Sequence, residues 1–166
     1  MQDTQNRIQA VFLLHQKLYG GVEGTAVDVA DYILELVNYL CETFDTYAHE
    51  ISITHDLEHI PLDASEMLPL AVILNEAITN SIKYAFPGNG KGEIHLTLRK
   101  LATGKLYLQI RDNGIGLPAG LHHVSKKSLG LNLIKGLVSQ LHGSYTIEND
   151  GGVVVTIQFT PRRTSI

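Results

Sequence analysis

The residues Leu-Asn-Glu-Ala-Ile-Thr-Asn-Ser-Ile-Lys-Tyr at positions 74–84 have two chemically different sides when they are placed on a helix. At about 100° per residue, the polar side chains fall within an arc of roughly 140°. These polar residues are Asn75, Glu76, Thr79, Asn80 and Lys83, and the apolar residues opposite them are Leu70, Leu74, Ala77 and Ile78. The pattern predicts a helix over residues 65–85 whose apolar side packs on a sheet.

Within this polar stripe, Glu76, Asn80 and Lys83 are spaced so that a carboxylate, an amide and an ammonium group follow one another along one face. Asn and Thr are weak helix formers, and so their place in the middle of a helix needs another reason. An amide oxygen beside a carboxylate suits Mg²⁺, and a lysine supplies a point charge for phosphates. The alternative, which the stripe alone favours, is the solvated face of an amphipathic helix.

Around this helix the sequence predicts an α+β fold. Helical spacing predicts three more helices, over residues 6–19, from a cap at Thr25 or Asp28 to Leu40, and over residues 129–142. Alternating apolar and polar residues predict strands over 51–54, where polar residues follow, and over 93–101, 105–111, 144–148 and 153–159. We therefore expect helices on one face of a largely antiparallel sheet, with residues 112–127 as a loop.

Two glycine-containing segments add further candidate binding residues. Asp112 follows a predicted strand and precedes Gly114 and Gly116, so the backbone there can approach a ligand closely. A carboxylate at this place can accept a hydrogen bond from an exocyclic amino group, which would select adenine over guanine; the alternative is an ordinary turn. Downstream, Ser128 is a plausible N-cap and Gly130 would expose backbone N–H groups to an anion, with a simply capped helix as the alternative.

The composition restricts the classes of function. The chain has 166 residues, of which 44% are hydrophobic, and its net charge is −4 from 13 Lys and Arg against 17 Asp and Glu. It can bury a core, and it lacks the basic excess of a general nucleic-acid binder. The single cysteine, Cys41, excludes an internal disulfide framework. Neither a signal peptide nor an apolar run of membrane-spanning length is present, and we expect a cytoplasmic location.

Taken in order, three motifs resemble the N, G1 and G2 boxes of the Bergerat ATP-binding fold, whose superfamily includes gyrase, a heat-shock chaperone class, bacterial histidine kinases and mismatch-repair ATPases. They are Glu76-x-x-x-Asn80-x-x-Lys83-Tyr84, Asp112-x-Gly114-x-Gly116 and Ser128-x-Gly130-Leu131, within residues 65–160. The resemblance implies a two-layer α/β sandwich with ATP between the helices and a flexible lid. Two departures are Ser128 in place of a glycine and the lack of a clear F box between residues 117 and 127.

The resemblance also implies roles for single residues. It makes Asn80 the Mg²⁺ ligand, Lys83 a phosphate contact and Tyr84 a neighbour of the nucleotide, with a core-edge aromatic as the alternative for Tyr84. Glu76 and Lys83 are the candidate catalytic residues, and Glu76 either supports magnesium or accepts a proton. The remaining implied nucleotide contacts are Asp112 at the adenine, Gly114 and Gly116 around the pocket, and Gly130 and Leu131 near the phosphates.

The upstream residues 7–10 and 15–19, with Leu74-Asn75-Glu76, resemble one subgroup of sensor histidine kinases of two-component systems. This implies that residues 1–24 are the end of a dimerisation and phosphoacceptor hairpin and that residues 25–166 are the ATP-binding catalytic domain. The acceptor histidine would then precede Met1, so we expect a fragment that binds ATP and Mg²⁺ but does not label itself. His15 is interpreted as structural, with phosphoacceptor as the alternative.

The expected reaction is transfer of the ATP γ-phosphoryl group to that histidine and then to an aspartate of a response regulator. The expected partners are the phosphoacceptor domain, the response regulator and a second copy of the chain, with no nucleic acid or membrane contact. Two alternatives stay open, a serine kinase of the anti-sigma type and a degenerate nucleotide-binding module used only for protein contacts.

Overall fold

The predicted strands assemble into one five-stranded sheet in the computed structural model, which describes residues 2–19, 26–88, 90–118 and 126–162. In spatial order the strands are β2 (Ile51–Leu57), β4 (Gly92–Lys100), β5 (Leu106–Asp112), β7 (Val153–Phe159) and β6 (Ser144–Asn149). Strands β2 and β4 pair in parallel, and the other neighbouring strands of this sheet pair antiparallel.

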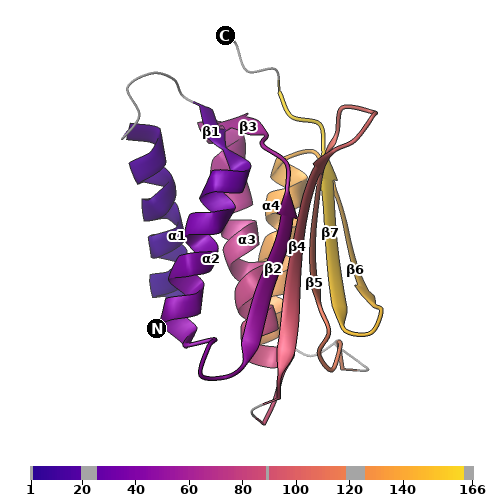
Figure 1. Ribbon diagram of the computed structural model, residues 1–166. Coiled ribbons are helices and arrows are strands. Elements are labelled where there is room, and N and C mark those ends of the chain that lie inside the picture. The colour runs from indigo at the N-terminus through magenta and orange to yellow at the C-terminus, as the bar shows by residue number, and fades with distance from the viewer. Residues whose placement is uncertain (1, 20–25, 89, 119–125, 163–166) are drawn as a thin grey trace.

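The helices all lie on one side of this sheet, as Figure 1 shows. They are α1 (Gln2–Tyr19), α2 (Val29–Phe44), α3 (Ala64–Tyr84) and α4 (Lys126–Gln140). In the view of Figure 1, α1 stands farthest from the sheet, and it packs on α2 and α3. The predicted α+β fold, with a mixed and mostly antiparallel sheet covered on one face, is therefore confirmed.

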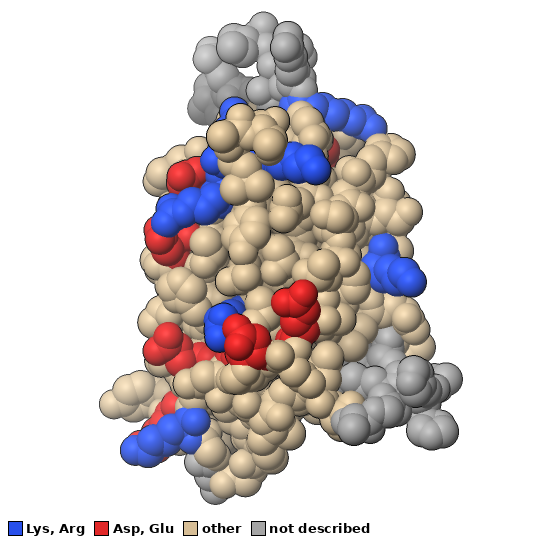
Figure 2. Space-filling view, turned by 90° about the vertical axis from the view of Figure 1, so that its right-hand side faces the viewer, with Lys and Arg blue, Asp and Glu red and all other residues tan. Residues whose placement is uncertain are grey.

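Register explains which side of the sheet the helices cover. Leu98, Leu108 and Ile157 are aligned across β4, β5 and β7, and all three are fully buried under the helices. On the other face of the same strands the aligned residues are polar, with Thr97, Gln109 and Thr156 partly exposed. Figure 2 views this open face, where side chains of both charge signs surround a broad uncharged area.

Short elements that the sequence analysis missed start two of the helices. Strand β1 (Ala26–Asp28) pairs with β3 (Pro61–Asp63), and each leads directly into a helix. Asp28 caps α2 by accepting a hydrogen bond from the backbone N–H of Asp31 at 3.0 Å, and Asp63 caps α3 in the same way. Three-residue strands are too short to show a period of two, which is why they were missed.

Several predicted boundaries were wrong: α1 begins at Gln2 and not at residue 6, and α2 continues beyond Leu40 to Phe44. Strand β2 continues to Leu57, because its polar residues His55 and Asp56 lie on an edge strand that solvent reaches while its backbone still pairs with β4. Helix α4 begins at Lys126, so Ser128 lies inside it and is not its N-cap. Residues 119–125, part of the expected loop and lid, lie outside the described residues. None of the helices that the structure describes has both the length and the apolarity required to cross a bilayer.

Candidate functional site

Asp112 ends β5 as a buried carboxylate with only 2% of its surface exposed. Its Oδ1 atom accepts hydrogen bonds from the backbone N–H groups of Gly114 and Val153, each at 3.0 Å. Its Oδ2 atom accepts one from the hydroxyl of Ser81 at 2.8 Å. Three donors hold a negative group that would otherwise be expensive to bury, and they fix its plane.

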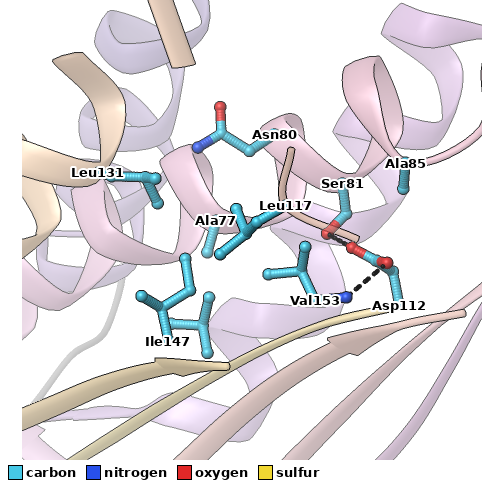
Figure 3. A pocket seen from close by; sticks show the side chains of 10 residues that line it. Ala77, Asn80, Ser81, Ala85, Asp112, Leu117, Leu131, Ile147 and Val153 are labelled. Carbon is cyan, nitrogen blue, oxygen red and sulfur yellow. Dashed lines mark hydrogen bonds between the residues drawn. The ribbon is translucent and has the colours of Figure 1, made fainter. Parts of the chain in front are cut away.

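A small pocket lies in front of this carboxylate and is partly open to solvent. Figure 3 shows Asp112 at one end, beside Ser81, and Leu131 and Ile147 at the other end. Most of the described lining is apolar: Ala77, Ala85, Leu117, Leu131, Ile147, Val153 and Val155. An apolar slot with one fixed acceptor suits a flat ring that carries an amino donor.

Close backbone approaches shape the pocket near Asp112. A Cβ at Gly114 would lie 2.2 Å from the carbonyl oxygen of Ala85, so only glycine fits there. Gly152 has a φ of +137°, and a Cβ on it would lie 2.0 Å from the carbonyl oxygen of Asp112. The sequence analysis identified Gly114 but missed Gly152, which belongs to the turn of the last hairpin. Gly116, with a φ of +79°, lies against Asn149, which also holds the backbone of Leu117.

The polar stripe of α3 is not a solvated face, because α1 packs across it. Asn75, Glu76 and Thr79 are 2%, 7% and 6% exposed. A second, polar cavity lies along this contact and is lined by Asp3, Asn6, Arg7, Asn75, Glu76, Thr79, Asn80, Lys83 and Tyr84. Among the residues that the structure describes, four buried polar atoms around this cavity have no hydrogen-bond partner: Asn6 Nδ2, Asn75 Oδ1, Thr79 Oγ1 and Asn80 Nδ2.

Both predicted catalytic side chains form ion pairs with α1. Glu76 Oε1 accepts a hydrogen bond from Arg7 Nε at 2.5 Å, and Lys83 pairs with Asp3. The hydrogen bond to Glu76 is the largest cause that raises the pKa of Arg7 above its ordinary value. The sequence analysis did not predict these contacts, because the partners are far apart in the sequence. The separation is 69 positions for Arg7 and Glu76 and 80 positions for Asp3 and Lys83.

Asn80 connects the two cavities, since it lines both of them. The structure thus brings Asn80, Asp112 and Leu131 together at the apolar pocket. It places Glu76, Lys83 and Tyr84 at the polar cavity instead, so Tyr84 does not line the apolar pocket. Among the residues that sequence reasoning missed, Ser81 follows Asn80 directly, and its hydroxyl on a buried helix face was the available signal.

The oxygen donors at this junction fit a hard divalent cation. A Cβ placed on Gly130 would lie 3.0 Å from Glu76 Oε2, 3.3 Å from Asn80 Nδ2 and 3.6 Å from Asn80 Oδ1. The Glu76 carboxylate and the Asn80 side-chain amide therefore both face the first turns of α4, and the amide nitrogen is nearer to Gly130 than the amide oxygen. This donor set is the type that Mg²⁺ uses in proteins, where it is completed by water and phosphate oxygens.

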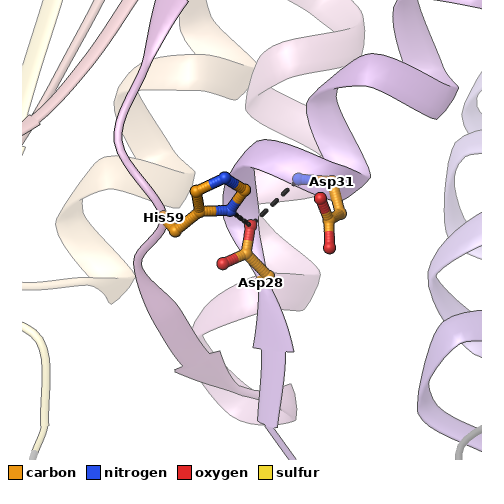
Figure 4. Close-up of side chains that lie close together, drawn as sticks. All are labelled: Asp28, Asp31 and His59. Carbon is orange, nitrogen blue, oxygen red and sulfur yellow. Dashed lines mark hydrogen bonds and ion pairs between the residues drawn. The ribbon is translucent and has the colours of Figure 1, made fainter.

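A second set of possible metal ligands lies at the start of α2, where Asp28, Asp31 and His59 approach one another (Figure 4). Asp28 already caps α2, and its Oδ1 atom lies 3.2 Å from Nδ1 of His59. Helix capping and this contact account for the cluster. None of its three residues lines the apolar pocket or the polar cavity.

Comparisons with known proteins agree with this geometry. The family model of histidine kinase-, DNA gyrase B- and HSP90-like ATPases matches residues 65–164, and a histidine kinase family model matches residues 1–44. Blue-light-activated histidine kinase 2 of Erythrobacter litoralis is 24% identical over 91% of this chain and 44% of its own length. An anti-sigma F factor of Bacillus licheniformis is 32% identical, but over only 32% of this chain and 36% of its own length.

Among solved structures, the histidine kinase domain of the Erythrobacter litoralis EL346 blue-light-activated kinase has the same fold. It superposes with a TM-score of 0.84 at 17% identity, covering 96% of this chain and 75% of that one. The chain spans less than half the length of the first curated relatives that it matches.

Proposed function

This chain belongs to the family of histidine kinase-, DNA gyrase B- and HSP90-like ATPases, and we propose that it is the ATP- and Mg²⁺-binding kinase domain of a sensor histidine kinase. The observation that carries the proposal is Asp112, a buried carboxylate that three donors hold at the end of an apolar pocket. Family membership implies nucleotide binding, and this pocket is the place in the described chain that suits a purine.

The adenine ring would lie between Leu131 and Ile147, with its amino group donating to Asp112. Because Asp112 Oδ1 already accepts two backbone N–H groups, Oδ2 is the oxygen that offers an acceptor to the base. Guanine presents a carbonyl oxygen at the corresponding position. Two acceptors would then face each other without a proton between them, and this is costly in a buried site.

The phosphates would extend from the pocket past Asn80 toward the start of α4. Asn80 would hold Mg²⁺ through its amide oxygen, with the carboxylate of Glu76 as its neighbour. The ion, when bound, neutralises charge on the phosphate oxygens. Lys83 would contact the phosphates after its ion pair with Asp3 opens. Phosphoryl transfer depends mostly on such positioning and charge stabilisation.

The γ-phosphoryl group would pass to a histidine of a phosphoacceptor helical domain and then to an aspartate of a response regulator. In this proposal residues 1–24 are part of the helical hairpin of that domain, which commonly pairs with a second copy, and residues 25–166 are the catalytic domain. The histidine kinase match over residues 1–44 supports this assignment over a serine kinase of the anti-sigma type.

Calorimetry on the chain with ATP and GTP, each with and without Mg²⁺, tests the proposal. We expect ATP to bind more tightly than GTP, and Mg²⁺ to strengthen ATP binding. Asp112→Asn should abolish the preference for ATP, because an amide presents a donor as well as an acceptor. Asp31→Asn, at an exposed residue of α2, makes the same chemical change away from the pocket and should have no effect. Equal binding of ATP and GTP by the unmodified chain would contradict the proposal.

A further inference from the structure

A further pocket lies at the opposite end of α3 from Asn80 and Ser81. It has a volume of about 340 Å³, is partly open to solvent, and is formed by the first turn of α3, the end of α4 and the segment after β7. In Figure 1 the start of α3 and the end of β7 both lie at the top of the molecule. At about 1.5 Å per residue, Glu66 in this pocket and Asn80 lie about 20 Å apart along the helix axis. The pocket is therefore separate from the proposed nucleotide site.

The pocket contains the buried carboxylate of Glu66, which is only 5% exposed. Its Oε1 atom accepts a hydrogen bond from the backbone N–H of Arg162 at 2.7 Å. Its Oε2 atom is buried as well, and the described part of the chain supplies no hydrogen-bond partner for it. A carboxylate oxygen in such a place is costly unless a donor meets it. The last torsion of a glutamate side chain is soft, so a small rotation turns Oε2 further toward the pocket and offers it to a ligand.

The surroundings of Glu66 favour a positively charged ligand. Gln140, the last residue of α4, and His142 line the pocket, so the negative end of the helix dipole lies beside it. The last turn of α4, which the structure describes, carries no basic residue. Burial is the largest cause that raises the pKa of Glu66, and the nearby carboxylate of Asp63 raises it further. The charge of Arg162 lowers this pKa, but by less than burial raises it, so the guanidinium does not compensate the buried carboxylate.

We propose that this pocket is a binding site for a primary ammonium group, that of a free alkylamine or of a lysine side chain. A primary ammonium is a compact charge with three donors, and it can pair with a single carboxylate oxygen. A guanidinium binds a carboxylate best through both oxygens, and Oε1 of Glu66 is already occupied by the N–H of Arg162. Gln140 and Thr160 offer further oxygen acceptors in the lining. The inference does not depend on the proposed function, because the two sites share no described lining residue.

An NMR titration of the folded chain with n-butylammonium chloride tests the inference, at neutral pH and constant ionic strength and without nucleotide or metal. We expect saturable shifts of the backbone N–H signals of Glu66, His142 and Arg162. The Kd should be on the order of millimolar, as suits a ligand of few atoms. Tetramethylammonium chloride carries the same charge without an N–H donor and should not bind. Methylguanidinium chloride should bind more weakly than butylammonium.

A lysine derivative distinguishes the two sources of the ammonium group. N-acetyl-lysine methylamide carries the same group on a peptide backbone. Tighter binding of this compound than of butylammonium assigns the site to a lysine side chain of a protein or peptide. Equal or weaker binding assigns it to a free amine.

Variants connect the binding to the carboxylate. Glu66→Gln keeps the shape of the side chain without its charge and should weaken butylammonium binding by about tenfold or more. Glu42→Gln makes the same change at an exposed residue of α2 and should leave binding unchanged. If Glu66→Gln does not fold, the exposed Gln140 gives an independent test. Gln140→Lys should weaken butylammonium binding by repulsion, and Gln140→Glu should strengthen it.

Three results would overturn the inference. The first is a spectrum that butylammonium leaves unchanged, because water alone would then satisfy Oε2 of Glu66. The second is equal binding of tetramethylammonium, and the third is butylammonium binding that persists in Glu66→Gln or is indifferent to the charge at Gln140. None of these measurements involves ATP, so their failure would leave the proposed function standing.

Discussion

Substituting Asp3 by Asn tests binding of the phosphates separately from binding of the adenine. Asp3 pairs with Lys83, whose side chain is 25% exposed while that of Asp3 is 38% exposed. In the proposed function Lys83 contacts the phosphates, so ATP must compete with Asp3 for the same ammonium group. Without the Asp3 carboxylate this competition ends, and ATP should bind more tightly.

The size of the effect follows from the exposure of the pair. Exposed ion pairs contribute about 0.2–1 kcal/mol, and this half-buried pair belongs near the upper end, at about 1 kcal/mol. Since 1.4 kcal/mol corresponds to a tenfold change in affinity, the Kd for ATP with Mg²⁺ should fall by about fivefold. Adenosine has no phosphates, and its Kd should not change.

Calorimetry with both ligands at low and high salt measures this difference. Glu35→Gln is the matched control. It also removes one negative charge, but Glu35 lies on α2 and pairs with Lys17, which is not a residue of the proposed site. The gain for ATP should shrink at high salt, where exposed charges are screened. Weaker ATP binding by Asp3→Asn, an equal change for adenosine, or the same gain in Glu35→Gln would refute the reasoning.

Three further outcomes are expected. Gly152→Ala would drive a Cβ into the Asp112 carbonyl at 2.0 Å, so nucleotide binding and several °C of thermal stability should be lost, whereas Gly151→Ala, with open space around it, keeps binding. Tyr32→Phe removes the hydroxyl that donates to Ala10 and should lower the free energy of unfolding by about 1 kcal/mol, measured with urea. Burial raises the pKa of Glu66 above its ordinary value, so the folded chain binds that proton more tightly than the unfolded chain does. Stability should therefore fall as pH rises from about 4 through the raised pKa, and Glu66→Gln should remove that part of the pH dependence; a profile identical in both proteins would contradict this.

Patterns that repeat within one segment were predictable. The helix bounds 65–85 and the observed Ala64–Tyr84 differ by one residue at each end, because its apolar and polar residues repeat over more than five turns. The same holds for β4 and β5, whose alternation fixes which face is buried. Asp112, Gly114 and Asn80 were identified because each is unusual for its local structure. Their roles toward a ligand remain proposals.

Contacts between distant segments were not predictable in this way. The polar stripe of α3 has the composition of a solvated face, and only the packing of α1 buries it. Nothing near Arg7 in the sequence indicates Glu76 as its partner, 69 residues away. Gly152 lies in the turn between β6 and β7, and its closeness to Asp112 depends on the pairing of β5 with β7.

A crystal structure of the chain with ADP and Mg²⁺ tests the central claim most directly. We predict the adenine amino nitrogen within hydrogen-bond distance of Asp112 Oδ2, the ring between Leu131 and Ile147, and the phosphates on the side of Asn80. Density for the nucleotide elsewhere on the chain, or a base turned so that Asp112 faces no donor, would contradict the account.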